Sequence, residues 1–262
     1  MMLEVKNLVI RFHDRIGGEA VHGVSFNMDS GERLGIVGES GAGKTLTALA
    51  ITRLLTDVTE IKGEITFQKT DMLAASDKEM RKIRGRDIGF IFQDPVASLN
   101  PLMRIGQQIE EPLLLHMDIS KEERRERVLQ AIRDVDLPDP EITINKFPHQ
   151  LSGGQCQRVM IASALICHPA LLIADEPTTA LDVTVQTQIL KLLKQKNKDE
   201  NVGILYISHD LSLVRRLCTR VIVMYNGDIV ETGPVEQVFT HPCEEYTKRL
   251  IAAIPTRSKR YV

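Results

Sequence analysis

Residues 34–45 read LGIVGESGAGKT, and they indicate the architecture of the chain more clearly than any other segment. Residues 34–37 form a short apolar run of the kind that makes a buried strand. A glycine-rich turn follows, and good helix formers then continue from residue 44 to residue 55. The order of strand, loop and helix predicts an α/β protein built around a sheet.

Three further apolar runs resemble residues 34–37, and they lie at residues 88–92, 170–174 and 202–207. Each predicted strand ends at polar residues: Gln93, Asp175 with Glu176, and Ser208 with His209. Open α/β sheets bind their ligands at the carboxyl ends of their strands, so we expect the site there. The alternation in the first twelve residues predicts an N-terminal strand, and Asn226-Gly227 between two β-type runs predicts a hairpin.

The turn at residues 38–45, hereafter the phosphate loop, matches G-x-x-x-x-G-K-[ST] without a gap. Its glycines allow backbone N–H groups to turn toward phosphate oxygens at the positive end of the following helix. Lys44 supplies a charge for the β- and γ-phosphates, and the Thr45 hydroxyl is suited to bind Mg²⁺. The predicted phosphate contacts are Gly38, Glu39, Ser40, Gly41, Ala42, Gly43, Lys44 and Thr45.

The acidic pair Asp175-Glu176 supplies the complementary chemistry. Asp175 is expected to hold the magnesium, directly or through water. Glu176 is expected to orient or deprotonate the attacking water. The sequence therefore predicts a nucleotide-hydrolysing site.

Residues 94–150 have a charged, helical sequence pattern that differs from that of the predicted sheet. Ser120 followed by Glu123 matches a capping box that starts a helix. The apolar stripe of that helix is Val128, Leu129, Ile132 and Val135. We therefore expect a helical subdomain inserted into the α/β core.

Composition excludes several classes of protein. The 262 residues carry 33 Lys plus Arg against 35 Asp plus Glu, a net charge of -2, so no basic field supports nucleic-acid binding. No apolar run approaches the roughly 18–20 residues that span a bilayer, and the N-terminus lacks the pattern of a signal peptide. The four cysteines form no Cys-x-x-Cys pair. A cytoplasmic protein is expected, unless other subunits hold it to a membrane.

Residues 151–155, LSGGQ, resemble the signature sequence of ABC-type ATPases. The resemblance implies ATP and Mg²⁺ as cofactors, and a second anion site that acts in trans on the ATP held by a partner's phosphate loop. That trans site would consist of Ser152, Gly153, Gly154 and Gln155.

Other residues match the family one at a time. Gln93 resembles the Q-loop glutamine, which reaches the metal and the attacking water. Asp182, in residues 180–182, resembles the D-loop aspartate at the dimer interface. His209 resembles the switch histidine that contacts the γ-phosphate. Phe12 lies where an aromatic side chain usually stacks on adenine, although ordinary strand core is an open alternative.

The resemblance narrows to the peptide and nickel importers through residues 93–101, 147–150 and 174–184. It implies a P-loop NTPase core of RecA-like mixed sheet over residues 1–93 and 151–240. Residues 94–150 would be the helical subdomain that contacts the permeases, and residues 241–262 a short C-terminal tail. The implied assembly has two transmembrane permease subunits, a second ATPase subunit or copy as an ATP-sandwich dimer, and an extracytoplasmic binding protein, with this chain on the cytoplasmic face of the membrane.

Two departures from the family stand out. Cys156 follows Gln155 directly, and residues 244–247 differ from the usual His-Pro-Tyr-Thr, which leaves the contacts of that region open. A soluble ABC ATPase of a metabolic complex, such as phosphonate degradation, is the alternative function. A GTPase is excluded because residues 145–148 lack the aspartate that reads guanine. Peptide against nickel, and homodimer against heterodimer, stay open.

Overall fold

A computed structural model describes residues 1–12, 18–55, 58–178 and 181–254. The chain divides into two compact units. Unit 1 contains Met1–Asp29, Arg33–Leu73 and Tyr206–Val262, and unit 2 contains Ser30–Glu32 and Ala74–Leu205. Strand β8 (Gly203–Ser208) crosses the division, with three residues in each unit.

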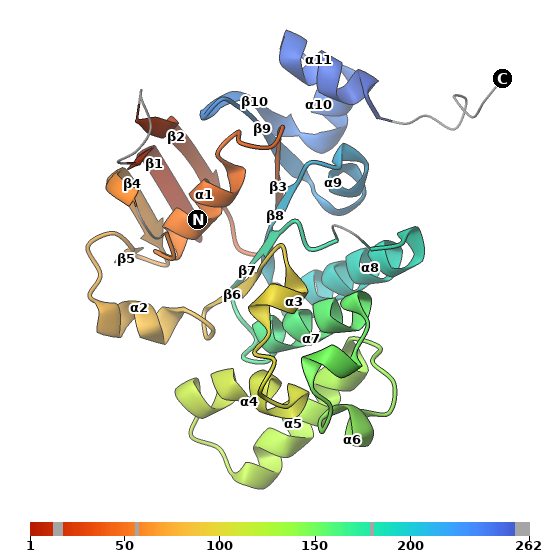
Figure 1. Ribbon diagram of the computed structural model, residues 1–262. Helices are drawn as coiled ribbons and strands as arrows, with labels where there is room; N and C mark the ends of the chain where they lie inside the picture. Colours follow the sequence, from red (N-terminus) through yellow and green to blue (C-terminus); the bar gives the residue numbers. More distant parts are fainter. Residues whose placement is uncertain (13–17, 56–57, 179–180, 255–262) are drawn as a thin grey trace, which may run out of the picture. The chain divides into compact units, whose positions relative to one another are not determined.

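Unit 1 begins with an antiparallel sheet in the order β2-β1-β4-β5. Its strands are β1 (Leu3–Phe12), β2 (Glu19–Met28), β4 (Val58–Phe67) and β5 (Thr70–Asp71) (Figure 1). Leu3, Val5, Leu8 and Ile10 of β1 are all buried, and register shifts interrupt both of its ladders. The predicted N-terminal strand is therefore part of an antiparallel sheet with one buried face.

A second group of strands in unit 1 carries the phosphate loop. Strand β3 (Arg33–Val37) runs parallel to β9 (Arg220–Tyr225), and β9 pairs antiparallel with β10 (Asp228–Pro234). Asn226 and Gly227 join β9 to β10 with φ values of 46° and 87°, as a type I′ hairpin turn requires. The predicted hairpin is confirmed. The helices of this unit are α1 (Lys44–Ile51), α9 (Leu211–Leu217), α10 (Val235–Thr240) and α11 (Glu245–Ala252).

Helix α1 is shorter than predicted. It ends at Ile51 instead of continuing to Leu55, because Arg53 adopts a left-handed conformation with φ of 50°. Helix propensity alone gave no sign of this end, since the residues beyond Ile51 include good helix formers.

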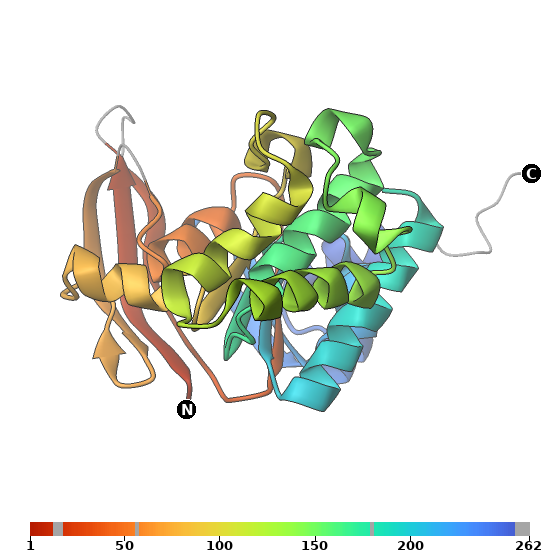
Figure 2. The ribbon, with the colours of Figure 1, turned by 90° about the horizontal axis from the view of Figure 1, so that it is seen from below.

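Unit 2 contains the parallel pair β6 (Ile88–Ile91) and β7 (Leu171–Asp175) together with a group of helices. These are α2 (Asp77–Ile83), α3 (Pro95–Ser98), α4 (Ile105–His116), α5 (Lys121–Asp134), α6 (Pro140–Thr143), the 3-10 helix η1 (Pro148–Gln150), α7 (Gly153–Leu165) and α8 (Val183–Glu200). Helices α4, α5 and α7 pack against one another, and both views show them side by side (Figures 1 and 2). Among the described residues, no helix combines the length and the apolar character needed to cross a membrane.

Helix α5 begins where the capping signal predicts, but with half of the predicted box. The Ser120 hydroxyl accepts a hydrogen bond from the Glu123 backbone N–H at 3.1 Å. The Glu123 carboxylate instead accepts from Arg127 at 2.7 Å, because an ion pair one turn along competes with the return bond. Val128, Leu129, Ile132 and Val135 are buried, as their spacing predicts.

Candidate functional site

The phosphate loop joins β3 to α1 within unit 1. Gly38, Gly41 and Gly43 have φ values of 152°, 84° and 96°, which side-chain-bearing residues rarely adopt. A Cβ atom on Gly38 would lie 2.2 Å from the Met224 carbonyl oxygen, whereas one on Gly41 would meet no atom within 4 Å. The glycines therefore serve two ends: Gly38 permits close packing on β9, and Gly41 leaves an open surface over the loop.

Lys44 closes the phosphate loop on itself. Its side chain is buried, and Nζ donates hydrogen bonds to the carbonyl oxygens of Gly38 at 2.9 Å and Glu39 at 2.8 Å. An ammonium group on backbone carbonyls can exchange those acceptors for phosphate oxygens, which carry full charge. The loop thus holds a cation in position at the N-terminus of α1.

Two other segments of unit 1 hold the loop from outside. The Gly227 N–H in the β9–β10 turn donates to the Ala42 carbonyl at 3.2 Å. The Glu39 N–H donates to the Tyr246 hydroxyl oxygen at 3.0 Å. Sequence reasoning missed both contacts, and no local pattern could have revealed them, because Tyr246 lies 207 residues from Glu39.

Phe12 and His209 are the remaining predicted site residues of unit 1. Phe12 is the last residue of β1 and is half-buried, which leaves both the stacking role and the strand-core role open. His209 follows β8 directly and is exposed. Its imidazole therefore lies at the carboxyl end of a strand, where open α/β sheets bind ligands, and its contact with a γ-phosphate stays a prediction.

Gln93 and Glu176 come together in unit 2 through strand register. Ile91 of β6 pairs with Ala174 of β7, and Gln93 and Glu176 each lie two residues further along their strands. The Gln93 Nε2 amide donates to Glu176 Oε2 at 3.1 Å. The amide thereby fixes one oxygen of the Glu176 carboxylate.

Asp175 and Glu176 differ in environment although they are neighbours. Asp175 ends β7 and is buried, whereas Glu176 is half-buried. Glu176 has a φ of 46°, a conformation that costs a non-glycine residue about 1–2 kcal/mol. Backbone strain of this kind concentrates at functional sites, where it aims a side chain.

The signature residues form the N-terminus of α7. Ser152 is its cap: its hydroxyl accepts from the Gln155 N–H at 3.3 Å, and Gln155 Oε1 accepts from the Ser152 N–H at 3.0 Å. A Cβ atom on Gly153 would meet no atom within 4 Å, so the helix terminus is open. Open N–H groups at the start of a 13-residue helix suit an anion.

Asp182 caps the neighbouring helix α8. Its carboxylate accepts from the N–H groups of Thr184 and Val185, both at 2.9 Å. A Cβ atom on Gly154 would lie 3.5 Å from Val185, so the starts of α7 and α8 are adjacent within unit 2. Of the predicted D-loop, Ala180 lies outside the described residues.

Cys156, the departure inside the signature region, points inward. It is 1% exposed, its Sγ lies 3.6 Å from the Pro148 carbonyl oxygen, and burial raises the pKa of its thiol. A buried neutral thiol is inert packing. The substitution therefore leaves the exposed face at Ser152 and Gly153 unaltered.

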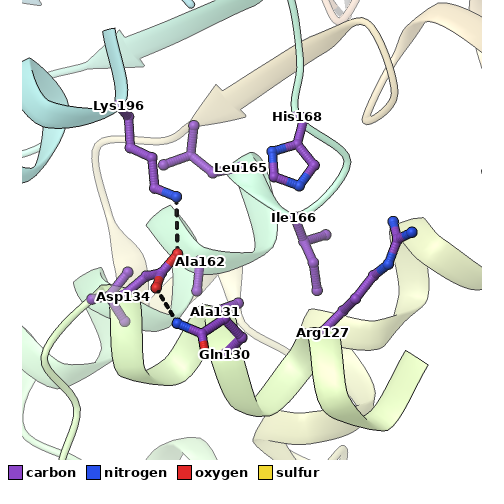
Figure 3. Close-up of a pocket in the computed structure, with 10 residues that line it drawn as sticks. Arg127, Gln130, Ala131, Asp134, Ala162, Leu165, Ile166, His168 and Lys196 are labelled. Atoms are coloured by element: carbon purple, nitrogen blue, oxygen red, sulfur yellow. Dashed lines mark hydrogen bonds and ion pairs between the residues drawn. The ribbon is translucent and has the colours of Figure 1, made fainter. Parts of the chain in front are cut away.

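A separate pocket lies between α5, α7 and α8, and its lining contains none of the predicted nucleotide residues (Figure 3). Beside it, Lys196 Nζ bonds Asp134 at 2.9 Å and Glu200 at 2.7 Å, and His168 bonds Glu200 at 2.8 Å. These four residues are hereafter the Lys196 network. The apolar floor of the pocket consists of residues that are buried in the helix packing, such as Ala162, Leu165 and Ile166.

The Lys196 network depends on ionised carboxylates. Burial raises the pKa of Asp134 and of Glu200, but the charge and hydrogen bonds of Lys196, together with a hydrogen bond from Gln130 to Asp134 and from His168 to Glu200, outweigh it and hold each pKa below its ordinary value of 3.8 or 4.5. A carboxylate whose pKa is lowered in the folded state stabilises the fold at any pH above its ordinary pKa. That stabilisation is lost as the pH falls through the lowered pKa. The network therefore favours the folded state at neutral pH and weakens in acid.

No group of three or more His, Cys, Asp or Glu side chains gathers as a metal site within the part of the chain that the structure describes. A magnesium ion here would need oxygen ligands from a nucleotide and from water beside those of the protein. Such shared coordination is usual for this ion.

Comparison with known proteins shows which family this chain is similar to. The model of the ABC transporter family matches residues 21–179. The oligopeptide transport ATP-binding protein OppD of Bacillus subtilis is 50% identical over 259 residues, which are 97% of this chain and 72% of OppD. The dipeptide transport ATP-binding protein DppD of Haemophilus influenzae is 46% identical, over 97% of this chain and 78% of DppD.

Among solved structures, this chain is similar to a dimeric ATP-binding cassette in a post-hydrolysis state bound to ADP and Pi. The TM-score is 0.81 with 33% sequence identity, covering 89% of this chain and 99% of the cassette.

Proposed function

This chain belongs to the ABC transporter family, and on that premise we propose that it is the ATP-hydrolysing subunit of an importer that takes up peptides. The predicted family and the predicted P-loop fold are confirmed by the comparisons. The observation that carries the proposal is the intact phosphate loop with Lys44, in a chain half identical to an oligopeptide transport ATP-binding protein. Relatives named for oligopeptide and dipeptide transport favour peptides over nickel as the cargo.

Within unit 1, the phosphate loop binds the phosphates of ATP. The N–H groups at the start of α1 face the phosphate oxygens, and Lys44 leaves its carbonyl partners for the β- and γ-phosphates. Thr45 and Asp175 would hold Mg²⁺, which neutralises charge on the phosphates when bound. The open surface at Gly41 fits a phosphate group, and the side-chain oxygens of Thr45 and Asp175 are of the kind that binds Mg²⁺.

Glu176 accepts the proton of the attacking water, or orients that water. Gln93 holds one oxygen of the carboxylate through its amide and so helps to orient the Glu176 side chain. His209 donates a hydrogen bond to the γ-phosphate, and Phe12 stacks on adenine. Support for these roles comes from the family positions that the residues match.

The working unit is a dimer in which each subunit completes its partner's site. Ser152 to Gln155 offer an open helix terminus to the nucleotide of the partner, and Asp182 lies beside the start of α7. The similar cassette is dimeric, which supports this arrangement. The partner is a second copy or a related ATPase subunit.

The helical region of residues 94–150 contacts two permease subunits, so that the chain works at the cytoplasmic face of the membrane, with an extracytoplasmic protein selecting the cargo. Val96 and Leu102 support this proposal, because they are 59% and 86% exposed and apolar.

Two measurements test the proposal together. The purified chain should hydrolyse ATP, and Lys44→Ala should abolish that turnover. A tagged chain recovered from gently solubilised membranes should co-purify with multi-span permeases and a second ATPase, identified by mass spectrometry. Turnover that is insensitive to Lys44→Ala would refute the ATPase role. Recovery of metabolic enzymes without any permease would favour the phosphonate-type alternative.

A further inference from the structure

Tyr246, near the start of α11, contacts the phosphate loop directly. Its hydroxyl oxygen accepts a hydrogen bond from the Glu39 N–H at 3.0 Å. The residue is 7% exposed, and its ring packs on Tyr225 with centroids 4.2 Å apart. Both residues at the two ends of this bond belong to unit 1. A neutral hydrogen bond this well shielded from water is a defined structural restraint.

The position of Tyr246 is itself fixed by β10. The Glu231 carboxylate accepts hydrogen bonds from the backbone N–H groups of Cys243 at 2.8 Å and Glu244 at 3.2 Å. These two groups precede α11 and would otherwise lack a partner within the helix. Glu231 therefore anchors the helix start, and the helix start presents Tyr246 to the loop.

The backbone N–H and the backbone carbonyl of Glu39 are held by two different side chains. Its N–H is bound by Tyr246, while its carbonyl, with that of Gly38, accepts from Lys44. When Lys44 turns to a phosphate, both carbonyls lose its hydrogen bonds, and the Glu39 carbonyl keeps the one from the Ala42 N–H at 3.2 Å within the loop. The Tyr246 hydroxyl still holds the Glu39 N–H from outside the loop, so its hydrogen bond matters more with nucleotide bound than without it.

We infer that Tyr246 is a positioning residue for ATP binding: its hydroxyl holds the Glu39 amide, and with it the N-terminal half of the phosphate loop, while Lys44 engages the phosphates. The inference rests on the proposed function, because it assumes that the loop binds ATP. It assigns a role to the segment in which residues 244–247 depart from the family pattern.

The test compares two tyrosines that pack on each other. Tyr246→Phe removes the hydroxyl and keeps the ring. Tyr225→Phe is the matched control, since its hydroxyl makes no hydrogen bond among the residues that the structure describes. Binding of the non-hydrolysable analogue AMP-PNP with Mg²⁺ is measured by calorimetric titration for both variants, the parent chain and Lys44→Ala, and thermal unfolding is recorded for each.

We expect Tyr246→Phe to weaken AMP-PNP binding about fivefold, which is about 1 kcal/mol at 1.4 kcal/mol per tenfold. Tyr225→Phe should bind like the parent chain. Equal affinity of Tyr246→Phe and the parent would overturn the inference, as would a lowered melting temperature at unchanged affinity or an equal loss in both variants. If the parent and Lys44→Ala both fail to bind, it is the proposed function that fails, and this outcome is distinct from the others.

Discussion

Replacing Glu176 by Gln should separate chemistry from folding at the strand ends of unit 2. The amide has nearly the size of the carboxylate and can still accept the Gln93 hydrogen bond through its oxygen. It cannot take a proton from water. The variant should therefore keep its structure and lose its turnover.

The magnitude follows from the two roles. Removing a general base costs about 10²–10⁴ in rate, which is roughly 2.7–5.4 kcal/mol of barrier at 1.36 kcal/mol per tenfold. Removing the charge from one half-buried hydrogen bond should change the free energy of unfolding by no more than about 1 kcal/mol. The strained φ of 46° is retained, because both residues adopt it at similar cost.

The assay is steady-state ATP turnover beside urea unfolding, with native gels in ATP to detect a trapped dimer. Glu126→Gln is the control, because this carboxylate pairs with Arg133 on an exposed face of α5. We expect it to match the parent chain in rate. Turnover by Glu176→Gln within a factor of about three of the parent would refute the role of Glu176 as the base.

Three other changes probe the remaining features. Gly38→Ala should destabilise by about 4 kcal/mol, from strain plus the 2.2 Å approach to Met224, against about 1–2 kcal/mol for Gly41→Ala; equal losses in urea unfolding would contradict this. Lys196→Met should flatten the fall in unfolding free energy between about pH 5 and pH 3, because the lowered pKa values of Asp134 and Glu200 depend on Lys196. An unchanged slope would show that the Lys196 network does not cause the fall. Ser152→Asp keeps a good helix cap but sets a negative charge at the proposed trans site, so thermal stability should hold while ATP-dependent dimerisation, measured by light scattering, is lost; dimerisation at the parental level would remove Ser152 from that site.

The sequence predicted those parts of the fold that local physics controls. The apolar runs became strands within a residue or two, and Asn226-Gly227 formed the expected turn because φ above zero favours these two residues. The end of α1 was missed, since the left-handed Arg53 carries no propensity signal. The partner of Glu123 was also missed, because a competing arginine one turn away decided it.

The candidate site divides in the same way. The phosphate loop and the acidic pair are contiguous motifs, so the sequence contains them whole. The pairing of Gln93 with Glu176 needs the register of two parallel strands, which only the folded sheet supplies. The contact of Tyr246 with Glu39 joins positions that no motif relates. It depends on the hydrogen bond by which Glu231 of β10 fixes the start of α11.

The turn at Asn226-Gly227 has a consequence for anyone who engineers this protein. Tips of hairpins are ordinarily the places where tags, reporter domains or new chain ends are tolerated. Here the tip supports the phosphate loop, because the Gly227 N–H donates a hydrogen bond to the Ala42 carbonyl. A Cβ atom at Gly227 would come within 2.9 Å of the Ala20 carbonyl oxygen. We therefore expect an insertion at this turn to disturb the phosphate loop, although the turn lies at the tip of a hairpin.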